Sequence, residues 1–176
     1  MTTTNDILTS AFAQATSAGI LLMAINLRNR TEGVVANDAG NYESVVIYDP
    51  PSTATPELIR QSLRAGVPFP RVGGAPLPGF FKLLGTRFAI IMNWAFPVFK
   101  ADLKLLDEQG HHTCGLQLHL PIYDPAAVPC PMAIIFRPCA GKLAMWYAGN
   151  QRDLSYERLI ACGAPLGERV GEALCS

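Results

Sequence analysis

Apolar positions near the N-terminus follow two different periods. Within "NDILTSAFAQATSAG", Leu8, Phe12 and Ala15 recur at helical spacing on one stripe, which predicts an amphipathic helix. Gly19 follows them and suits the C-terminal end of that helix. The next run, "ILLMAINLR", is apolar at consecutive positions, which predicts a strand buried on both faces in the middle of a sheet.

The same region raises the question of a membrane span. It carries no charged residue from Ile7 to Leu27, and a run of that length would cross a bilayer. Polar residues such as Thr9, Gln14 and Asn26 dilute the run, and its period changes at the glycine. These features favour a helix followed by a buried strand over a single long helix, and both over a transmembrane span.

Later segments carry recognisable start and stop signals. Thr55 suits the N-cap of a helix over "PELIRQSLRAG", with Pro56 at its first position and Glu57 in its first turn. Ser155 suits the N-cap of "YERLIACG", and "LGERVGEAL" predicts one more short helix. Strands are predicted over "YESVVIYD" and "RFAIIMNWAF", and "PMAIIFRP" with "KLAMWYAG" predicts a hairpin.

A second hairpin is predicted within "FPVFKADLKLLDEQGHHTCGLQLHLPIY". A loop over 107–110 places Leu105 opposite His112 and Leu103 opposite Cys114, so one face is apolar and the other polar. Matched alternation on two strands makes a register hard to shift. Together these elements predict an α+β fold, with a mainly antiparallel sheet of about six to seven strands, an N-terminal helix, one inserted helix and C-terminal helices.

The segment 67–81 interrupts the series of helices and strands. "VPFPRVGGAPLPGFF" is dense in proline and glycine, so it cannot join a ladder or a helix, because prolines lack N–H groups and glycines resist ordering. Its phenylalanine and leucine side chains distinguish it from a solvated linker. We interpret it as an extended arm of a single domain over 1–176, packed either on its own core or on another subunit.

The tetrapeptide Ile-Tyr-Asp-Pro occurs at 47–50 and again at 122–125. The first copy precedes a predicted helix and the second a predicted strand. An internal duplication would place the same type of secondary structure after both copies. We therefore interpret the two copies as similar strand-exit turns. In each, the aspartate accepts nearby backbone N–H groups and the proline fixes φ.

The chain is weakly charged for its size. Charged residues make up 16% of the sequence, against roughly 25% in a typical domain, and the formal net charge is zero, which excludes a strong global attraction to nucleic acid or to an anionic membrane. Residues 1–56 have two basic and five acidic side chains, residues 57–104 seven and two, and residues 105–176 five and seven. The basic middle suits an anion or the acidic end of a neighbouring copy.

The five cysteines are odd in number and include no CxxC pair, and the N-terminus lacks the basic region of a signal peptide. We therefore expect reduced thiols in the cytoplasm, with no metal and no cofactor.

The reactive side chains cluster in "HHTCGLQLH". In an extended strand His111 and His119 are roughly 27 Å apart, too far to share a metal. His112 and Cys114 share the apolar face of the predicted hairpin, where packing is the simpler role. No catalytic residue is predicted, because a third member such as Asp124 or Cys130 would have to come from elsewhere.

The leading hypothesis is a non-enzymatic structural or assembly protein, either a homo-oligomer or a component of a larger particle such as a virion. Low charge density, the apolar arm and the alternating charge blocks motivate it. Trp146 and Tyr147 are adjacent on a predicted strand, so one of the two rings must point away from the core. The expected interface residues are Phe69, Arg71, Leu77, Phe80, Phe81, Trp146 and Tyr147.

Two alternatives stay open. One is an anion- or nucleic-acid-binding module in the basic region 57–104, which would bind through Arg60, Arg64, Arg71, Lys82 and Arg87. The other is a small cysteine-dependent enzyme that uses Cys114 or Cys130 with His112. A membrane partner is not expected.

Overall fold

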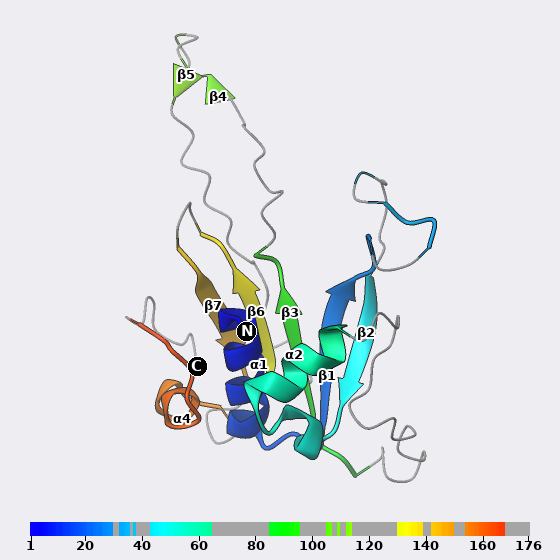
Figure 1. The fold of residues 1–176 in the computed structure, drawn as a ribbon. Coiled ribbons are helices and arrows are strands. Elements are labelled where there is room, and N and C mark those ends of the chain that lie inside the picture. Colours follow the sequence, from blue (N-terminus) through cyan, green and yellow to red (C-terminus); the bar gives the residue numbers. More distant parts are fainter. Residues whose placement is uncertain are drawn as a thin grey trace.

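The computed structural model describes residues 1–29, 32–35, 37, 43–64, 85–95, 105–106, 109, 112–113, 130–138, 142–149 and 154–167. Within them, five strands form one sheet in the order β2-β1-β3-β6-β7. Helices α1 and α2 lie across one face of this sheet and α4 lies beside α1, toward the β7 edge (Figure 1). The strands are β1 (Ile20–Asn26), β2 (Glu43–Tyr48), β3 (Phe88–Asn93), β6 (Met132–Phe136) and β7 (Ala144–Ala148), and the helices are α1 (Thr4–Thr16), α2 (Pro56–Arg64) and α4 (Tyr156–Ala161).

The α+β class is confirmed, but the predicted antiparallel sheet of six to seven strands is wrong. The described sheet has five strands and is mixed: β1, β3 and β6 run parallel, and β2 and β7 pair antiparallel at its two edges. The three parallel strands are the long apolar runs, which is the pattern of strands buried on both faces in a parallel sheet. The predicted N-terminal, inserted and C-terminal helices correspond to α1, α2 and α4. The last predicted helix, over 166–174, lies largely outside the described residues, and the single domain over 1–176 stays a prediction.

The first helix ends earlier than its glycine suggested. α1 stops at Thr16, and Ser17 takes the left-handed conformation at φ 49°. Gly19 serves a different purpose, because its N–H donates to the Arg87 carbonyl at 3.0 Å and a Cβ at Gly19 would lie 2.6 Å from Thr86 Cγ2. The absence of a side chain therefore lets the start of β1 approach the chain that leads into β3.

The first Ile-Tyr-Asp-Pro turn forms as predicted. The 3-10 helix η1 (Pro50–Thr53) follows β2, and the Asp49 carboxylate accepts hydrogen bonds from the Ser52 backbone N–H and hydroxyl. Thr55 then accepts from the Leu58 N–H at the start of α2, which confirms its role as a cap. The second copy, at 122–125, lies outside the described residues.

The C-terminal helix also begins and ends as predicted. The Ser155 side chain accepts from the Arg158 N–H, which confirms the N-cap of α4. At the other end Gly163 has φ 86°, its N–H bonds the Ile160 carbonyl, and the Ala164 N–H bonds the Leu159 carbonyl. This pair of bonds is a Schellman motif, in which glycine takes the left-handed position without steric cost.

The predicted hairpin around 107–110 is present in part, with a different register. β4 (Leu105–Leu106) and β5 (His112–Thr113) form a separate two-stranded sheet in which Leu105 pairs with Thr113 and Leu106 with His112. The predicted pairing of Leu105 with His112 is therefore wrong by one residue. The register of a hairpin follows its loop length, and this pairing encloses a loop one residue longer than the sequence pattern predicted. Leu103 and Cys114 lie outside the described residues.

One apolar core fills the space between the sheet and the helices. It joins Phe12 of α1, Ile59 of α2 and Leu159 of α4 to strand residues such as Met23 and Ile91. No helix in the described ranges is both long enough and apolar enough to cross a membrane, and the span considered above is divided between α1 and β1.

Candidate functional site

The two faces of the sheet have different surroundings. On β1, Leu21, Met23 and Ile25 belong to the core beneath the helices. Leu22 and Ala24 alternate with them and therefore point to the opposite face. The described helices pack against the first face only, as α1 and α2 do in Figure 1. We call the second face the helix-free face.

The helix-free face is apolar over most of its length, with Asn26 of β1 opposite Glu43 of β2 as a polar pair at one end. The pairing register aligns alternate residues of neighbouring strands into rows across the sheet. Each complete row on this face has an apolar residue at all five positions. The rows are Ile47–Leu22–Ile90–Met132–Ala148 and Val45–Ala24–Met92–Ile134–Trp146.

Exposure on this face is lowest on β6 and highest at the β2 edge. Ile134, on β6, is 0% exposed and Met132 is 5% exposed, whereas Val45 on β2 is 40% exposed. Trp146, on the other edge strand, is partly buried. The exposed end of the helix-free face therefore lies at β2.

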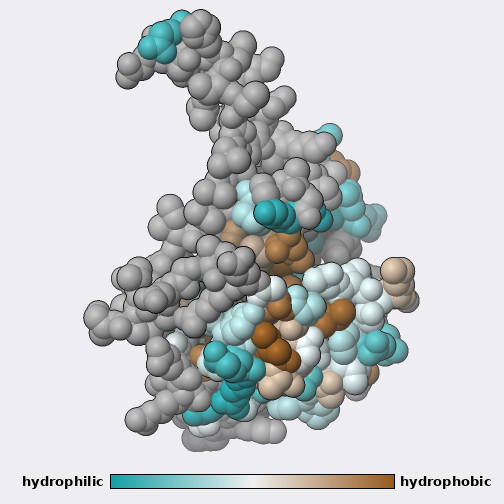
Figure 2. Space-filling view, turned by 90° about the vertical axis from the view of Figure 1, so that its left-hand side faces the viewer, coloured by the Kyte–Doolittle hydropathy of each residue, from teal (hydrophilic) through white to brown (hydrophobic). Residues whose placement is uncertain are grey.

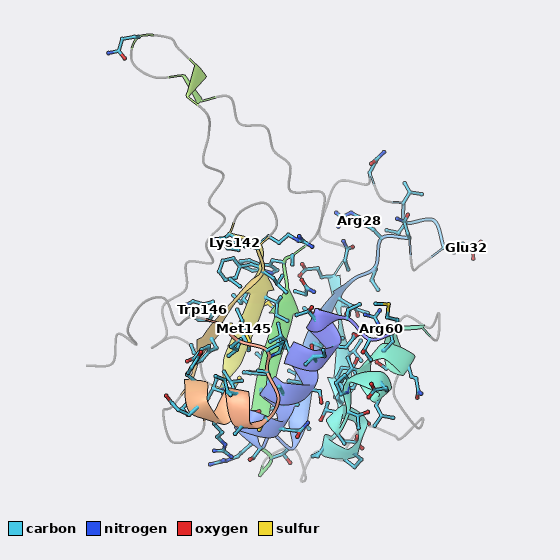
Figure 3. All side chains as sticks on the ribbon, turned by 60° about the vertical axis from the view of Figure 1, so that its left-hand side comes forward. Arg28, Glu32, Arg60, Lys142, Met145 and Trp146 are labelled. Atoms are coloured by element: carbon cyan, nitrogen blue, oxygen red, sulfur yellow. The ribbon has the colours of Figure 1, made fainter. Side chains whose placement is uncertain are left out.

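The tryptophan–tyrosine pair divides between the two faces, as the sequence predicted. Tyr147 and Met145 pack against the core beneath the helices. Trp146 alternates with them on β7 and pairs with Ile134 on the helix-free face. The neighbouring positions of Met145 and Trp146 are labelled in Figure 3. Trp146 thus contributes an aromatic ring to the candidate interface, whereas Tyr147 belongs to the core.

The surface on the side that carries α4 and β7 mixes apolar and hydrophilic residues. Apolar residues there are interspersed with hydrophilic ones (Figure 2). Two large apolar side chains are exposed in this region, Leu143 at 40% just before β7 and Ile160 at 44% on α4. The described apolar residues on this side are therefore interrupted by hydrophilic ones (Figure 2).

A polar cluster fastens α1 to α2. Asp6 in the first turn of α1 is fully buried and forms an ion pair with Arg60 of α2, with 2.6 Å between Arg60 Nη2 and Asp6 Oδ2. Arg60 also donates to Thr3 Oγ1 at 2.6 Å. Arg60 lies on α2 and points toward the start of α1 (Figure 3). Nearby, Asn93 at the end of β3 donates from Nδ2 to Asn5 Oδ1 at 2.7 Å, so the start of α1 is tied to the sheet as well.

Only some of the residues expected to bind an anion lie within the described ranges. The Arg60 side chain is occupied by Asp6 and Thr3, which reduces its availability to an external anion. Arg87 is exposed, and its carbonyl accepts the N–H groups of Gly19 and Ile20. Arg64 lies in the last turn of α2. Arg71 and Lys82, like the arm residues Phe69, Leu77, Phe80 and Phe81, lie outside the described residues.

The cysteine chemistry gains no support from the described residues. Burial raises the pKa of the Cys130 thiol, which is opposite to the lowered pKa of an activated nucleophile. His112 lies on β5, and its proposed partners Cys114 and Asp124 lie outside the described residues. Among the residues that the structure describes, no three His, Cys, Asp or Glu side chains gather in a group that could hold a metal ion.

Comparisons with protein-family models, with curated proteins and with solved structures found no match.

Sequence reasoning missed both main features of this region. The helix-free face had a signal, because "FAIIMN" and "MAIIF" are apolar at odd and even positions alike, so a sheet built from them must have two apolar faces. The Asp6 cap also had a signal, since Thr3 and Asp6 have the spacing of a capping box. The partner of Asp6 had none, because Arg60 is 54 residues away in the sequence.

Proposed function

We propose that this chain is a non-enzymatic structural protein that assembles with further copies of itself, as a homo-oligomer or as part of a larger particle. The observation that supports the proposal is the helix-free face, with two rows that are apolar across all five strands. A strand with one face in water alternates apolar and polar residues, so the face that meets the water is mainly polar. Large exposed apolar surfaces mark interaction sites, and the part of this face that is open to a partner is its β2 end, because Met132 and Ile134 are already buried within the chain.

The partner in this proposal is a second copy, and the contact includes the β2 end of the helix-free face. Val45 is the one large apolar residue of that face, among those the structure describes, that is exposed, at 40%. The chain has a formal net charge of zero, so two copies approach without net repulsion. The arm over 67–81 supplies the complementary surface in this proposal, because its apolar side chains can cover a sheet face without requiring ladder hydrogen bonds.

The cytoplasm stays the proposed compartment. Cys130 and Cys162 are both free thiols, which supports a reducing environment.

Light scattering after size exclusion tests the proposal with two matched substitutions. Val45→Lys places a charge on the helix-free face, and Ile160→Lys places one on α4, at similar exposures of 40% and 44%. We expect the wild-type chain to elute above its monomer mass of 19.0 kDa and Val45→Lys to shift it toward the monomer. Ile160→Lys should leave the mass unchanged.

Two results would contradict the proposal. One is a wild-type chain that stays at 19.0 kDa over the whole accessible concentration range. The other is an equal decrease in mass for Val45→Lys and Ile160→Lys. An added charge on the sheet and one on α4 would then both act through general solubility, and not through contact at the helix-free face.

A further inference from the structure

Within the described residues, the buried carboxylate of Asp6 receives its hydrogen bonds on one oxygen. Asp6 Oδ2 accepts from the Thr3 N–H at 2.7 Å, from the Thr3 hydroxyl at 2.9 Å and from Arg60 Nε at 2.8 Å. Asp6 Oδ1 is buried and has no hydrogen-bond partner within the described part of the chain. Each carboxylate oxygen has lone pairs that need donors, so this oxygen lacks a donor.

Thr9, one turn further along α1, presents the same problem. Its side chain is 0% exposed, and its hydroxyl has no partner among the described residues. Thr16 on the same helix shows the usual solution, because its hydroxyl donates back to the Phe12 carbonyl at 3.0 Å and to the Ala13 carbonyl at 3.1 Å. The Thr9 hydroxyl makes no such bond to a described backbone carbonyl.

The spacing of the two groups suits one small bridging molecule. Residues three apart on a helix lie on the same face, with about 5–6 Å between their Cβ atoms. A water molecule that makes two hydrogen bonds of about 2.8 Å spans that separation. Internal waters commonly satisfy buried polar groups of this kind.

The charge balance favours a neutral ligand over a cation. Asp6 already has a full positive charge beside it, since Arg60 Nη2 lies 2.6 Å from Oδ2. A metal cation at Oδ1 would be repelled by that guanidinium at close range and would leave water for a buried site. Water can donate to Asp6 Oδ1 and accept from the Thr9 hydroxyl at once.

We propose that a single buried water bridges Asp6 Oδ1 and Thr9 Oγ1 and completes the polar cluster at the start of α1. This site is independent of the assembly proposed above. It explains how a buried carboxylate oxygen and a buried hydroxyl persist on α1, where the buried hydroxyls of Ser10 and Thr16 find their partners in backbone carbonyls.

The experiment compares the wild-type chain with Thr9→Val and Thr9→Ser. Valine has nearly the shape of threonine but no hydroxyl, and serine keeps the hydroxyl. Water-proton magnetic relaxation dispersion counts long-lived internal waters, and thermal unfolding measures stability. We expect Thr9→Val to lose one long-lived water and to lower the unfolding midpoint by about 2–4 °C, whereas Thr9→Ser should keep the water.

Each other outcome overturns the proposal. An unchanged number of long-lived waters in Thr9→Val would show that no water depends on this hydroxyl. A raised unfolding midpoint in Thr9→Val would show that the hydroxyl is simply unsatisfied, because removing an unpaired buried polar group is stabilising. A midpoint that depends on replacing sodium with potassium in the wild-type chain, but not in Thr9→Val, would assign the site to a cation.

Discussion

The hydroxyl of Tyr48 lies 2.6 Å from Ser62 Oγ, and both residues are buried between β2 and α2. Ser62 Oγ also lies 2.8 Å from the Ile59 carbonyl, to which it donates. Its proton is therefore committed, and Tyr48 acts as the donor in the pair. This short chain of hydrogen bonds connects the end of β2 to the middle of α2.

Tyr48→Phe should lower the free energy of unfolding by about 1 kcal/mol, because it removes one buried hydrogen bond while Ser62 keeps its bond to the backbone. Urea denaturation of the wild-type and variant chains measures the change. Ser62→Ala should cost at least as much, since it removes both the bond to the tyrosine hydroxyl and the bond to the Ile59 carbonyl. If the double variant shows additive losses, the two side chains are not coupled and the hydrogen bond contributes nothing.

Gly19→Ala should destabilise the fold by about 1–3 kcal/mol, because the new Cβ would meet Thr86 Cγ2 at 2.6 Å. Thr86→Ser removes that methyl group and keeps the hydroxyl, so it should recover much of the loss in the double variant. Gly85→Ala is the matched control, since a Cβ there meets no atom within 4 Å. Chemical denaturation that finds Gly19→Ala as stable as Gly85→Ala would contradict the close approach.

Cys130 should react slowly with iodoacetamide at neutral pH. Burial raises the pKa of this thiol above its usual 9.0, so the thiolate fraction at pH 7 is lower than that of a free thiol. Peptide mass spectrometry over a pH series gives the rate at Cys130 alone, and the rate should still be rising at pH 9. A rate that reaches its plateau below pH 8 would show an activated thiol and would revive the hypothesis of a cysteine-dependent enzyme.

Replacing 67–79 with a short Gly/Ser linker should reduce the mass measured by light scattering and leave the thermal unfolding of the sheet nearly unchanged. The proposed role of the arm is contact between copies, so its loss removes an interface rather than a core. The salt response separates this role from anion binding, because nucleic-acid affinity through the basic region falls steeply with added salt. An oligomer of unchanged mass in the linker variant would refute the role of the arm.

The sequence predicted which segments form strands but not how those strands run. Apolar runs such as the one over Ile20–Asn26 identify buried strands, and local cap residues such as Ser155 identify helix starts. Strand direction depends on where the chain crosses the sheet, and the local pattern that accompanies parallel pairing, a run of consecutive apolar residues, was interpreted only as burial on both faces. The register of Leu105 failed for a related reason, since apolar matching across a hairpin competes with the geometry of its loop.

The sequence likewise predicted some residues of the candidate site and missed others. Alternation along a strand sufficed to place Trp146 and Tyr147 on opposite faces. The Asp6–Arg60 pair was beyond such reasoning, because it depends on the packing of α1 against α2 and not on either helix alone. The apolar rows of the helix-free face likewise appear only when the strand order is known.

The parallel pairing of β1 has a consequence for how the chain acquires its structure during synthesis. β1 can pair early with β2, its close neighbour in sequence, but its other edge waits for β3, where Ile20 meets Phe88. Contacts between such distant segments slow folding, because the entropy cost of closing a long loop comes before the contacts form and stabilise the chain. A nascent chain on the ribosome therefore holds an apolar strand with one open edge until more than sixty further residues have emerged, a separation given by the positions of Asn26 and Phe88. Over that interval β1 is a natural substrate for a holding chaperone.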